Sequence, residues 1–230
     1  MNFKPDVTVV LTSCGRQDLL ERTLDSFFAT NTYEGIAEIL ITEDSGLSGV
    51  NDSLKSKYAD RAITWIDSLG HRGLIECIDD AYSRVRTPYV FHCEDDWRFY
   101  HPGYIEASKV ILEADRRMLQ LWLRADSDTN GHPLEEGIFE VSMGGKRARY
   151  RLLSVDFQGH WHGFSFNPGL RRISDYLRVA PFKDVGHECD LSVRYRSEGF
   201  RAGLLLREDG GNGFVEHIGW TRHVDVDQYA

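Results

Sequence analysis

The sequence predicts an α/β fold in which a mostly parallel sheet is flanked by helices on both faces. Short apolar runs alternate with segments of helical periodicity over residues 7–93. The apolar runs are continuous, which is typical of strands that are buried on both faces. Polar side chains directly follow three of the runs, at the strand ends where ligands gather in open α/β sheets. Consecutive strand–helix–strand units explain all three observations.

The elements of the first half can be assigned in chain order. Residues 7–12 read VTVVLT, a β-branched run that predicts a buried strand. In the next segment Leu20, Leu24 and Phe27 recur at helical spacing, which predicts an amphipathic helix. The predicted elements are strand 7–12, helix 17–28, strand 37–42, a short helix, strand 62–66, helix 73–85 and strand 89–93.

The second half predicts a smaller, mixed β region. Residues 125–137 are polar and contain Gly and Pro, which predicts a loop, and residues 138–166 carry β-type patterning. No linker divides the chain, so we expect a single domain over residues 1–230. The other predicted elements are helix 104–114, strand 119–123, helices 170–177 and 188–197, and strand 201–206.

Three consecutive carboxylates follow the strand at residues 89–93. Glu94, Asp95 and Asp96 repel one another and would destabilise a strand end unless a cation or hydrogen-bond donors lie among them. Hard oxygen ligands suit Mg²⁺ or Mn²⁺, which commonly bridge to the phosphates of a substrate. The segment therefore predicts a divalent metal site, with a solvated acidic turn as the alternative.

Composition and charge exclude several classes of function. The chain has 230 residues, 41% of them hydrophobic, and can fill a sizeable core. Its net charge of -9 argues against a general nucleic-acid-binding protein. No apolar run is long enough to cross a bilayer, and the N-terminus lacks a signal-peptide core, so we expect a cytoplasmic protein. The four cysteines form no C-x-x-C pair, which fits a reducing compartment.

Five segments carry motifs in a fixed sequence order: VVLTSCGR (9–16), TEDSG (42–46), residues 73–89, CEDD (93–96) and GHECDLSVR with the following GFR (186–201). Together they resemble the motifs of the family 2 glycosyltransferases, which are nucleotide-sugar enzymes of the GT-A fold. The chain departs from the family pattern at Gly15, where Asn is usual, and at Ile78-Asp79, where Arg-Asn is usual. His187 replaces a Glu.

The resemblance implies an inverting, metal-dependent glycosyltransferase that moves a sugar from a nucleoside-diphosphate sugar to the hydroxyl of a saccharide or other acceptor. Residues 1–115 would form the nucleotide-sugar-binding half, and residues 116–230 the acceptor and catalytic-base half. Asp96 would be the first ligand of Mn²⁺ or Mg²⁺, with Asp95 and His217 as further ligands. The implied nucleotide-sugar-binding residues are Thr12, Arg16, Glu43, Asp44, Arg72, Glu94 and Asp95.

Glu188 stands where the resembled family keeps its catalytic base. Asp190 is the alternative candidate for the base. Two acids two residues apart do not share a helix face, so we expect only one of them to point into the site. Both acids also suit the first turn of a helix, where the dipole favours negative charge. Trp97 and Trp161 are candidate platforms for a sugar ring on the acceptor side. Asp79 is expected to be a solvated helix residue.

Two other functions remain open at this point. A nucleotidyltransferase on a related α/β sheet would also need acids for a metal. It would normally have a Gly-rich, basic phosphate loop after its first strand, which residues 12–16 match poorly. The departures from the family pattern at residues 78, 79 and 187 also leave open a non-catalytic nucleotide- or carbohydrate-binding module. The sequence identifies neither the sugar, nor the acceptor, nor the oligomeric state.

Overall fold

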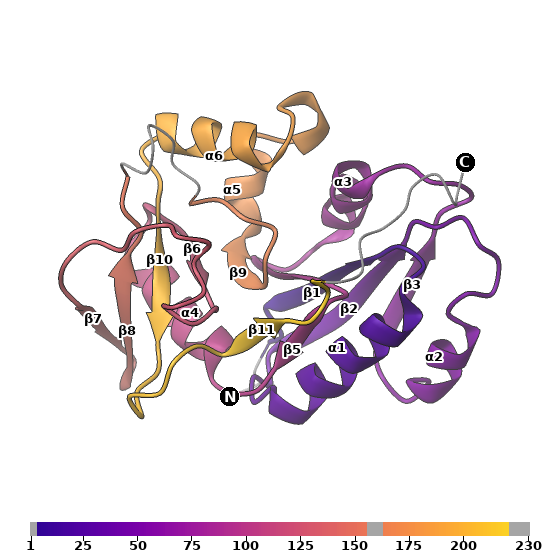
Figure 1. Ribbon diagram of the computed structural model, residues 1–230, viewed down its shortest axis with the longest axis horizontal. Helices are drawn as coiled ribbons and strands as arrows, with labels where there is room; N and C mark the ends of the chain where they lie inside the picture. The colour runs from indigo at the N-terminus through magenta and orange to yellow at the C-terminus, as the bar shows by residue number, and fades with distance from the viewer. Residues whose placement is uncertain (1–3, 156–162, 221–230) are drawn as a thin grey trace.

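The computed structural model describes residues 4–155 and 163–220 (Figure 1). Within these residues the central sheet contains β1 (Val7–Ser13), β2 (Ile36–Glu43), β3 (Ile63–Asp67), β4 (Tyr89–Glu94) and β9 (Gly169–Arg172). Its strand order is β3-β2-β1-β4-β9. Strands β1 to β4 pair in parallel, and β9 pairs antiparallel with β4. The sheet is therefore mostly parallel, with its single antiparallel strand at one edge.

A second sheet in the described residues contains β6 (Met118–Trp122), β7 (Phe139–Met143), β8 (Lys146–Leu152) and β10 (Arg201–Leu206). Its order is β6-β10-β8-β7, and it is mixed because β10 runs parallel to β6 and antiparallel to β8. A short antiparallel pair joins β5 (Trp97–Phe99) to β11 (Val215–His217). This pair brings the last described part of the chain beside the segment that follows β4 (Figure 1).

Helices cover both faces of the central sheet. Side chains on β1 alternate between the faces, so that Val9 and Leu11 belong to one core and Val10 to the other. Helices α1 (Gln17–Thr30) and α4 (Tyr104–Ala114) contribute to the first core, and α3 (Leu74–Arg84) and α6 (Glu188–Ser197) to the second. The shorter helices are α2 (Asp52–Lys57), α5 (Ile173–Leu177) and the 3-10 helix η1 (Phe182–Asp184). In the described ranges, no helix combines the length and the apolar character that crossing a membrane requires.

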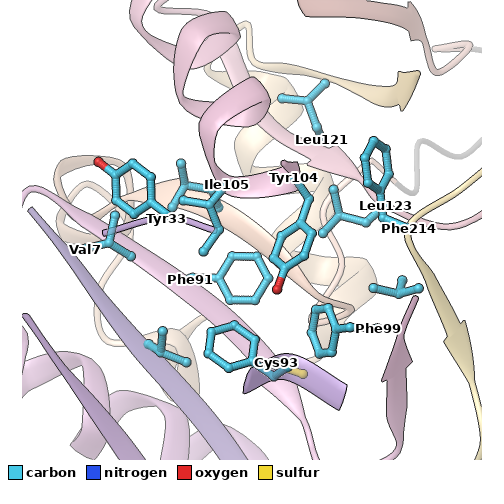
Figure 2. Close-up of a cluster of buried hydrophobic side chains, with 14 of the residues drawn as sticks. Val7, Tyr33, Phe91, Cys93, Phe99, Tyr104, Ile105, Leu121, Leu123 and Phe214 are labelled. Carbon is cyan, nitrogen blue, oxygen red and sulfur yellow. The ribbon is translucent and has the colours of Figure 1, made fainter. Parts of the chain in front are cut away.

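An aromatic cluster fills the space between the central sheet and α4 (Figure 2). The ring centroids of Phe91 and Tyr104 are 5.5 Å apart, and those of Phe99 and Tyr104 are 5.2 Å apart. Phe214, which precedes β11, packs edge-on against Tyr104 at 6.4 Å. Burying a side chain of this size contributes about 1.5–3 kcal/mol. The cluster therefore holds β5 and the start of β11 against the end of β4.

The predicted α/β class and the order of its main strands and helices are confirmed, with two errors. Residues 138–166 were expected to form β structure, but in the described part of this segment the strands cover only Phe139–Met143 and Lys146–Leu152. Residues 170–177 were expected to form a helix, but Gly169–Arg172 form β9 and the helix begins at Ile173. Leu170 pairs with Phe91 of β4, and this ladder takes the backbone groups that a helix would have used. The three-residue strands β5 and β11 were not predicted, because runs so short carry no measurable periodicity.

Candidate active site

Strand register places the polar carboxyl ends of β1, β2 and β4 side by side at one end of the central sheet. Thr12 pairs with Glu94 on one side and with Thr42 on the other, and the next residue, Ser13, pairs with Glu43. A cavity of about 150 Å³ opens at this end, and we call it the strand-edge cavity. Its lining includes Thr12, Arg16, Asp44, Glu94 and Asp95. The sheet thus brings together five of the residues that the sequence singled out.

Arg16, which immediately precedes α1, contacts two carboxylates at once. Its guanidinium pairs with Asp95 through Nε and Nη2, while Nη1 lies 2.9 Å from Asp96 Oδ2. The Ser13 hydroxyl donates a further hydrogen bond to Asp95 at 2.9 Å. Burial raises the pKa of Asp95 to about 6, even though Arg16 and Ser13 stabilise the charged form. Asp95 thereby fixes Arg16 at the strand-edge cavity.

Asp96 is held by the last residue of β11 and by the two residues that follow it. His217 Nε2 lies 3.1 Å from Asp96 Oδ2, and the Ile218 N–H donates to the Asp96 carbonyl at 2.8 Å. Gly219 packs so closely that a Cβ there would lie 2.5 Å from Asp96 Oδ2. Burial acts to raise the pKa of Asp96, but the hydrogen bonds and charges of His217 and Arg16 outweigh it and lower the pKa. The structure therefore brings the predicted Asp96 and His217 together.

The side-chain atoms at Asp96 that could bind a metal fit a divalent cation that also binds water or substrate oxygens. Asp96 Oδ1 is buried and has no hydrogen-bond partner among residues 4–155 and 163–220. Carboxylate and imidazole are both ordinary ligands of Mn²⁺. In the same described ranges, no three His, Cys, Asp or Glu side chains are arranged to hold a metal. A cation here would complete its coordination with water and phosphate oxygens, as Mg²⁺ usually does.

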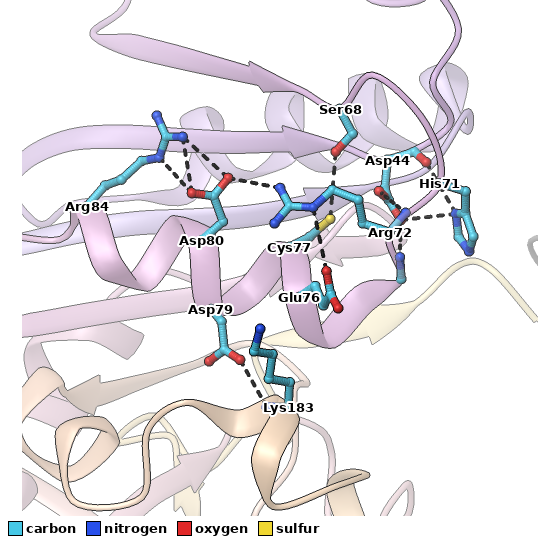
Figure 3. A network of polar contacts seen from close by, with 11 residues as sticks. Asp44, Ser68, His71, Arg72, Glu76, Cys77, Asp79, Asp80, Arg84 and Lys183 are labelled. Carbon is cyan, nitrogen blue, oxygen red and sulfur yellow. Dashed lines mark hydrogen bonds and ion pairs between the residues drawn. The ribbon is translucent and has the colours of Figure 1, made fainter.

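Glu43 and Asp44 organise the loops around the strand-edge cavity. Asp44 accepts hydrogen bonds from the N–H groups of Arg72 and Gly73 at 2.9 and 2.8 Å (Figure 3). Glu43 accepts from the Gly15 N–H at 2.8 Å. The Arg72 guanidinium turns to acidic side chains of α3. Glu43 and Asp44 are almost fully buried, and each also has a side-chain partner: Asn51 donates to Glu43 at 3.2 Å, and His71 Nδ1 lies 3.0 Å from Asp44.

Asp79 is not the solvated helix residue that the sequence predicts. It is buried, and its carboxylate accepts hydrogen bonds from the Tyr176 hydroxyl and from the N–H groups of Phe182 and Lys183 at 2.9, 2.9 and 3.0 Å. These donors satisfy a carboxylate that burial would otherwise destabilise. The signal in the sequence was its spacing of three residues from Tyr82, which places both on the buried face of α3.

Glu188 is the first residue of α6 and lies at a second cavity of about 310 Å³, which we call the α6 cavity. Its Oε2 accepts a hydrogen bond from the Phe166 N–H at 3.1 Å. Asp190 instead accepts from the His187 N–H at 2.9 Å and so caps α6. Other residues that line the α6 cavity are Trp122, Thr129, Asn130, His132, Ser165 and Asn167.

Glu94 connects the two cavities electrostatically. It lines the strand-edge cavity, and the Trp97 indole nitrogen lies 3.5 Å from its Oε2. Burial is the main reason that the pKa of Glu94 rises to about 8, and the charges of Asp96, Glu188 and Asp95 raise it further. The negative charge of Glu188 therefore disfavours the charged form of Glu94.

Two tryptophans and an arginine surround His217. Trp97 is 2% exposed, and its ring centroid lies 5.0 Å from that of His217. Trp220 is 58% exposed and packs edge-on against His217 at 4.5 Å. The Arg124 guanidinium lies 5.3 Å from the Trp97 ring and 5.8 Å from the Trp220 ring. Trp161 lies outside the described residues.

The chain is similar to solved structures of glycosyltransferases. With the mannosyltransferase PcManGT from Pyrobaculum calidifontis, a complex with GDP-Man and Mn²⁺, the TM-score is 0.63 at 15% identity, covering 87% of this chain and 55% of that one. The TM-score with S. aureus TarS in complex with UDP-GlcNAc is 0.62 at 11% identity, and the match covers 95% of this chain and 62% of that one. With GalNAc-T7, a structure with UDP, GalNAc and Mn²⁺, it is 0.63 at 11% identity, covering 95% and 45%.

At these identities the likeness shows the fold, and the predicted GT-A-like class is confirmed. The chain spans between 45% and 62% of the length of the three structures. No protein-family model and no curated protein matches the chain. The more specific resemblance to family 2 therefore stays a prediction from the motifs.

Proposed function

We propose that this protein is an inverting, metal-dependent glycosyltransferase that moves a sugar from a nucleoside-diphosphate sugar to an acceptor hydroxyl. The observation that carries the proposal is a pair of cavities, of which one opens at the carboxyl ends of the parallel strands of a GT-A-like sheet and the other at the start of α6. One cavity adjoins carboxylates suited to a divalent cation, and the other has an exposed carboxylate at its wall. The charge of Glu188 is one of the causes that raise the pKa of Glu94, which supports assigning both cavities to one site.

The strand-edge cavity would take the nucleoside diphosphate. Asp96 and His217 would hold Mn²⁺ or Mg²⁺, and the bound cation would supply Lewis-acid stabilisation to the departing diphosphate. Arg16 lines this cavity and offers a planar cation to phosphate oxygens. Glu43 and Asp44 would act by shaping the loops that enclose the nucleotide. The GDP-Man, UDP-GlcNAc and Mn²⁺ of the similar structures support this assignment.

The α6 cavity would take the acceptor, and Glu188 would be the general base. The polar side chains of Asn130, Ser165 and Asn167 suit an acceptor rich in hydroxyl groups. The Phe166 N–H orients the Glu188 carboxylate, whereas Asp190 is engaged in the cap of α6. The acceptor oxygen would attack the anomeric carbon as its proton passes to Glu188, and this direct displacement inverts the configuration there.

The substitution Glu188→Gln tests the proposal through nucleoside-diphosphate release from a panel of sugar nucleotides with Mn²⁺ and simple sugar acceptors. Gln can still accept the Phe166 hydrogen bond but cannot take a proton, so we expect turnover to fall by about 10²–10⁴-fold with unchanged donor affinity. The matched control is Asp190→Asn, which removes a charge two residues away and keeps an oxygen for the helix cap. It should retain turnover.

Full turnover in Glu188→Gln would contradict the assignment of the base. Pyrophosphate formation by the wild-type protein would instead support a nucleotidyltransferase. Donor binding without release of nucleoside diphosphate, under every condition tried, would support a non-catalytic module.

A further inference from the structure

A positively charged side chain lies between the carboxylates that a divalent cation would need. The Arg16 guanidinium contacts Asp95 through Nε and Nη2 and contacts Asp96 Oδ2 through Nη1 at 2.9 Å. Asp95 is fully buried and Asp96 is 6% exposed, so water contributes little to stabilising either charge. Arg16 is therefore the counter-ion of a buried pair of carboxylates.

The carboxylate of Asp96 is shared between two donors. Arg16 lies 2.9 Å and His217 3.1 Å from the same oxygen, Oδ2. Oδ1 is buried and has no hydrogen-bond partner in the described parts of the chain, so its lone pairs suit a cation. A cation at either oxygen would lie close to the guanidinium, and like charges repel strongly over such distances when water is excluded.

We infer that Arg16 competes with the divalent cation for Asp96 and has to leave this carboxylate when the cation binds. The inference rests on the cation-binding role proposed for Asp96, but it does not depend on sugar transfer. Arg16 also lines the strand-edge cavity, so a guanidinium that leaves Asp96 stays where phosphate oxygens would bind. Without nucleotide, the protein should therefore bind Mn²⁺ weakly.

The substitution Arg16→Met tests this competition directly. Binding of Mn²⁺ alone is measured from the loss of the electron paramagnetic resonance signal of free Mn²⁺, with no nucleotide present. Methionine fills much of the space of the arginine stem but carries no charge. We expect Mn²⁺ to bind about tenfold tighter, or more, because one nearby like charge has been removed. The gain should disappear in the double variant Arg16→Met/Asp96→Asn.

Two further variants control for charge and for folding. Arg84 holds both oxygens of Asp80 on the exposed surface of α3, so Arg84→Met removes a similar ion pair away from the site and should leave Mn²⁺ affinity unchanged. Arg16→Lys keeps a buried positive charge, but a single ammonium cannot bridge two carboxylates as a guanidinium does. It should give a smaller gain than Arg16→Met.

The possible outcomes separate this inference from the proposed function. If wild type and Arg16→Met bind Mn²⁺ equally, and Asp96→Asn removes that binding, the cation site stands and the competition is disproved. If neither protein binds Mn²⁺, the cation-binding role of Asp96 falls as well. Should Arg16→Met fail to fold, Arg16→Lys decides, because affinity equal to or below that of wild type would overturn the inference.

Discussion

His92, in the middle of β4, is a buried imidazole enclosed by aromatic side chains. Its ring lies 5.8 Å from Tyr82 and 5.5 Å from Phe166. Neither ring nitrogen has a hydrogen-bond partner within residues 4–155 and 163–220. Burial, assisted by the positive charge of Arg171, holds the pKa of His92 well below its ordinary 6.5. His92 therefore remains neutral in the folded protein and behaves as an apolar core residue.

The substitution His92→Leu should reveal this neutral state in the pH dependence of stability. The unfolded histidine takes up a proton below pH 6.5 and the folded one does not, so wild type loses up to about 1.4 kcal/mol per pH unit as the pH falls. His92→Leu should lack this contribution to the change of unfolding free energy with pH. Near neutral pH its free energy of unfolding should equal that of wild type or exceed it by about 1 kcal/mol. Urea unfolding at several pH values measures both effects, and equal slopes would contradict the prediction.

At the scale of elements, single buried polar side chains anchor segments that sheet pairing does not reach. Arg171 of β9 donates to Gln120 at 2.8 Å, to Tyr82 at 2.9 Å and to the carbonyl of Ser165. The chain at residues 165–167 forms part of the α6 cavity and holds Glu188 through its backbone. In the same way Asp79 fastens α3 to η1. These contacts connect the core to which α3 and α6 contribute with the proposed acceptor site.

The substitution Asp79→Ala should lower the free energy of unfolding by about 2–4 kcal/mol, because it leaves buried donors unsatisfied. The next residue provides a matched control. Asp80 pairs with Arg72 and Arg84 on the surface of α3, where such contacts contribute little. Asp80→Ala should therefore change stability by about 0.5 kcal/mol or less. Similar losses in the two variants, measured by urea unfolding, would show that Asp79 is not an anchor.

On the scale of the whole molecule, the site is assembled from distant parts of the chain. Arg16 follows β1, the acids Glu94, Asp95 and Asp96 lie at the end of β4 or directly after it, and β11 supplies His217. Sequence alone predicted this convergence for the parallel strands, since their long apolar runs and polar ends are local signals. The antiparallel addition of β9, the β5–β11 pair and the hydrogen-bond partners of Asp79 depend on contacts between remote segments. No local pattern records such contacts, so these features emerged only from the structure.

Binding of Mn²⁺ and nucleoside diphosphate at this assembled site should stabilise the entire fold. A ligand present at a hundred times its Kd stabilises the folded state by about 2.7 kcal/mol, so the unfolding temperature should rise when both are added. Thermal unfolding with uridine, guanosine, cytidine and thymidine diphosphates measures the effect. His217→Ala should lose the Mn²⁺-dependent part of the shift. If none of the four nucleotides raises the unfolding temperature, the proposed donor site is wrong.

The β5–β11 pair also sets the order in which the site can form as the ribosome makes the chain. Asp96 leaves the exit tunnel long before His217 and Gly219, which pack against it in the finished protein. Arg16 is made earlier still, so a partner for the acidic side chains is present from the start. The proposed cation site would stay incomplete until His217 and Gly219 have left the tunnel.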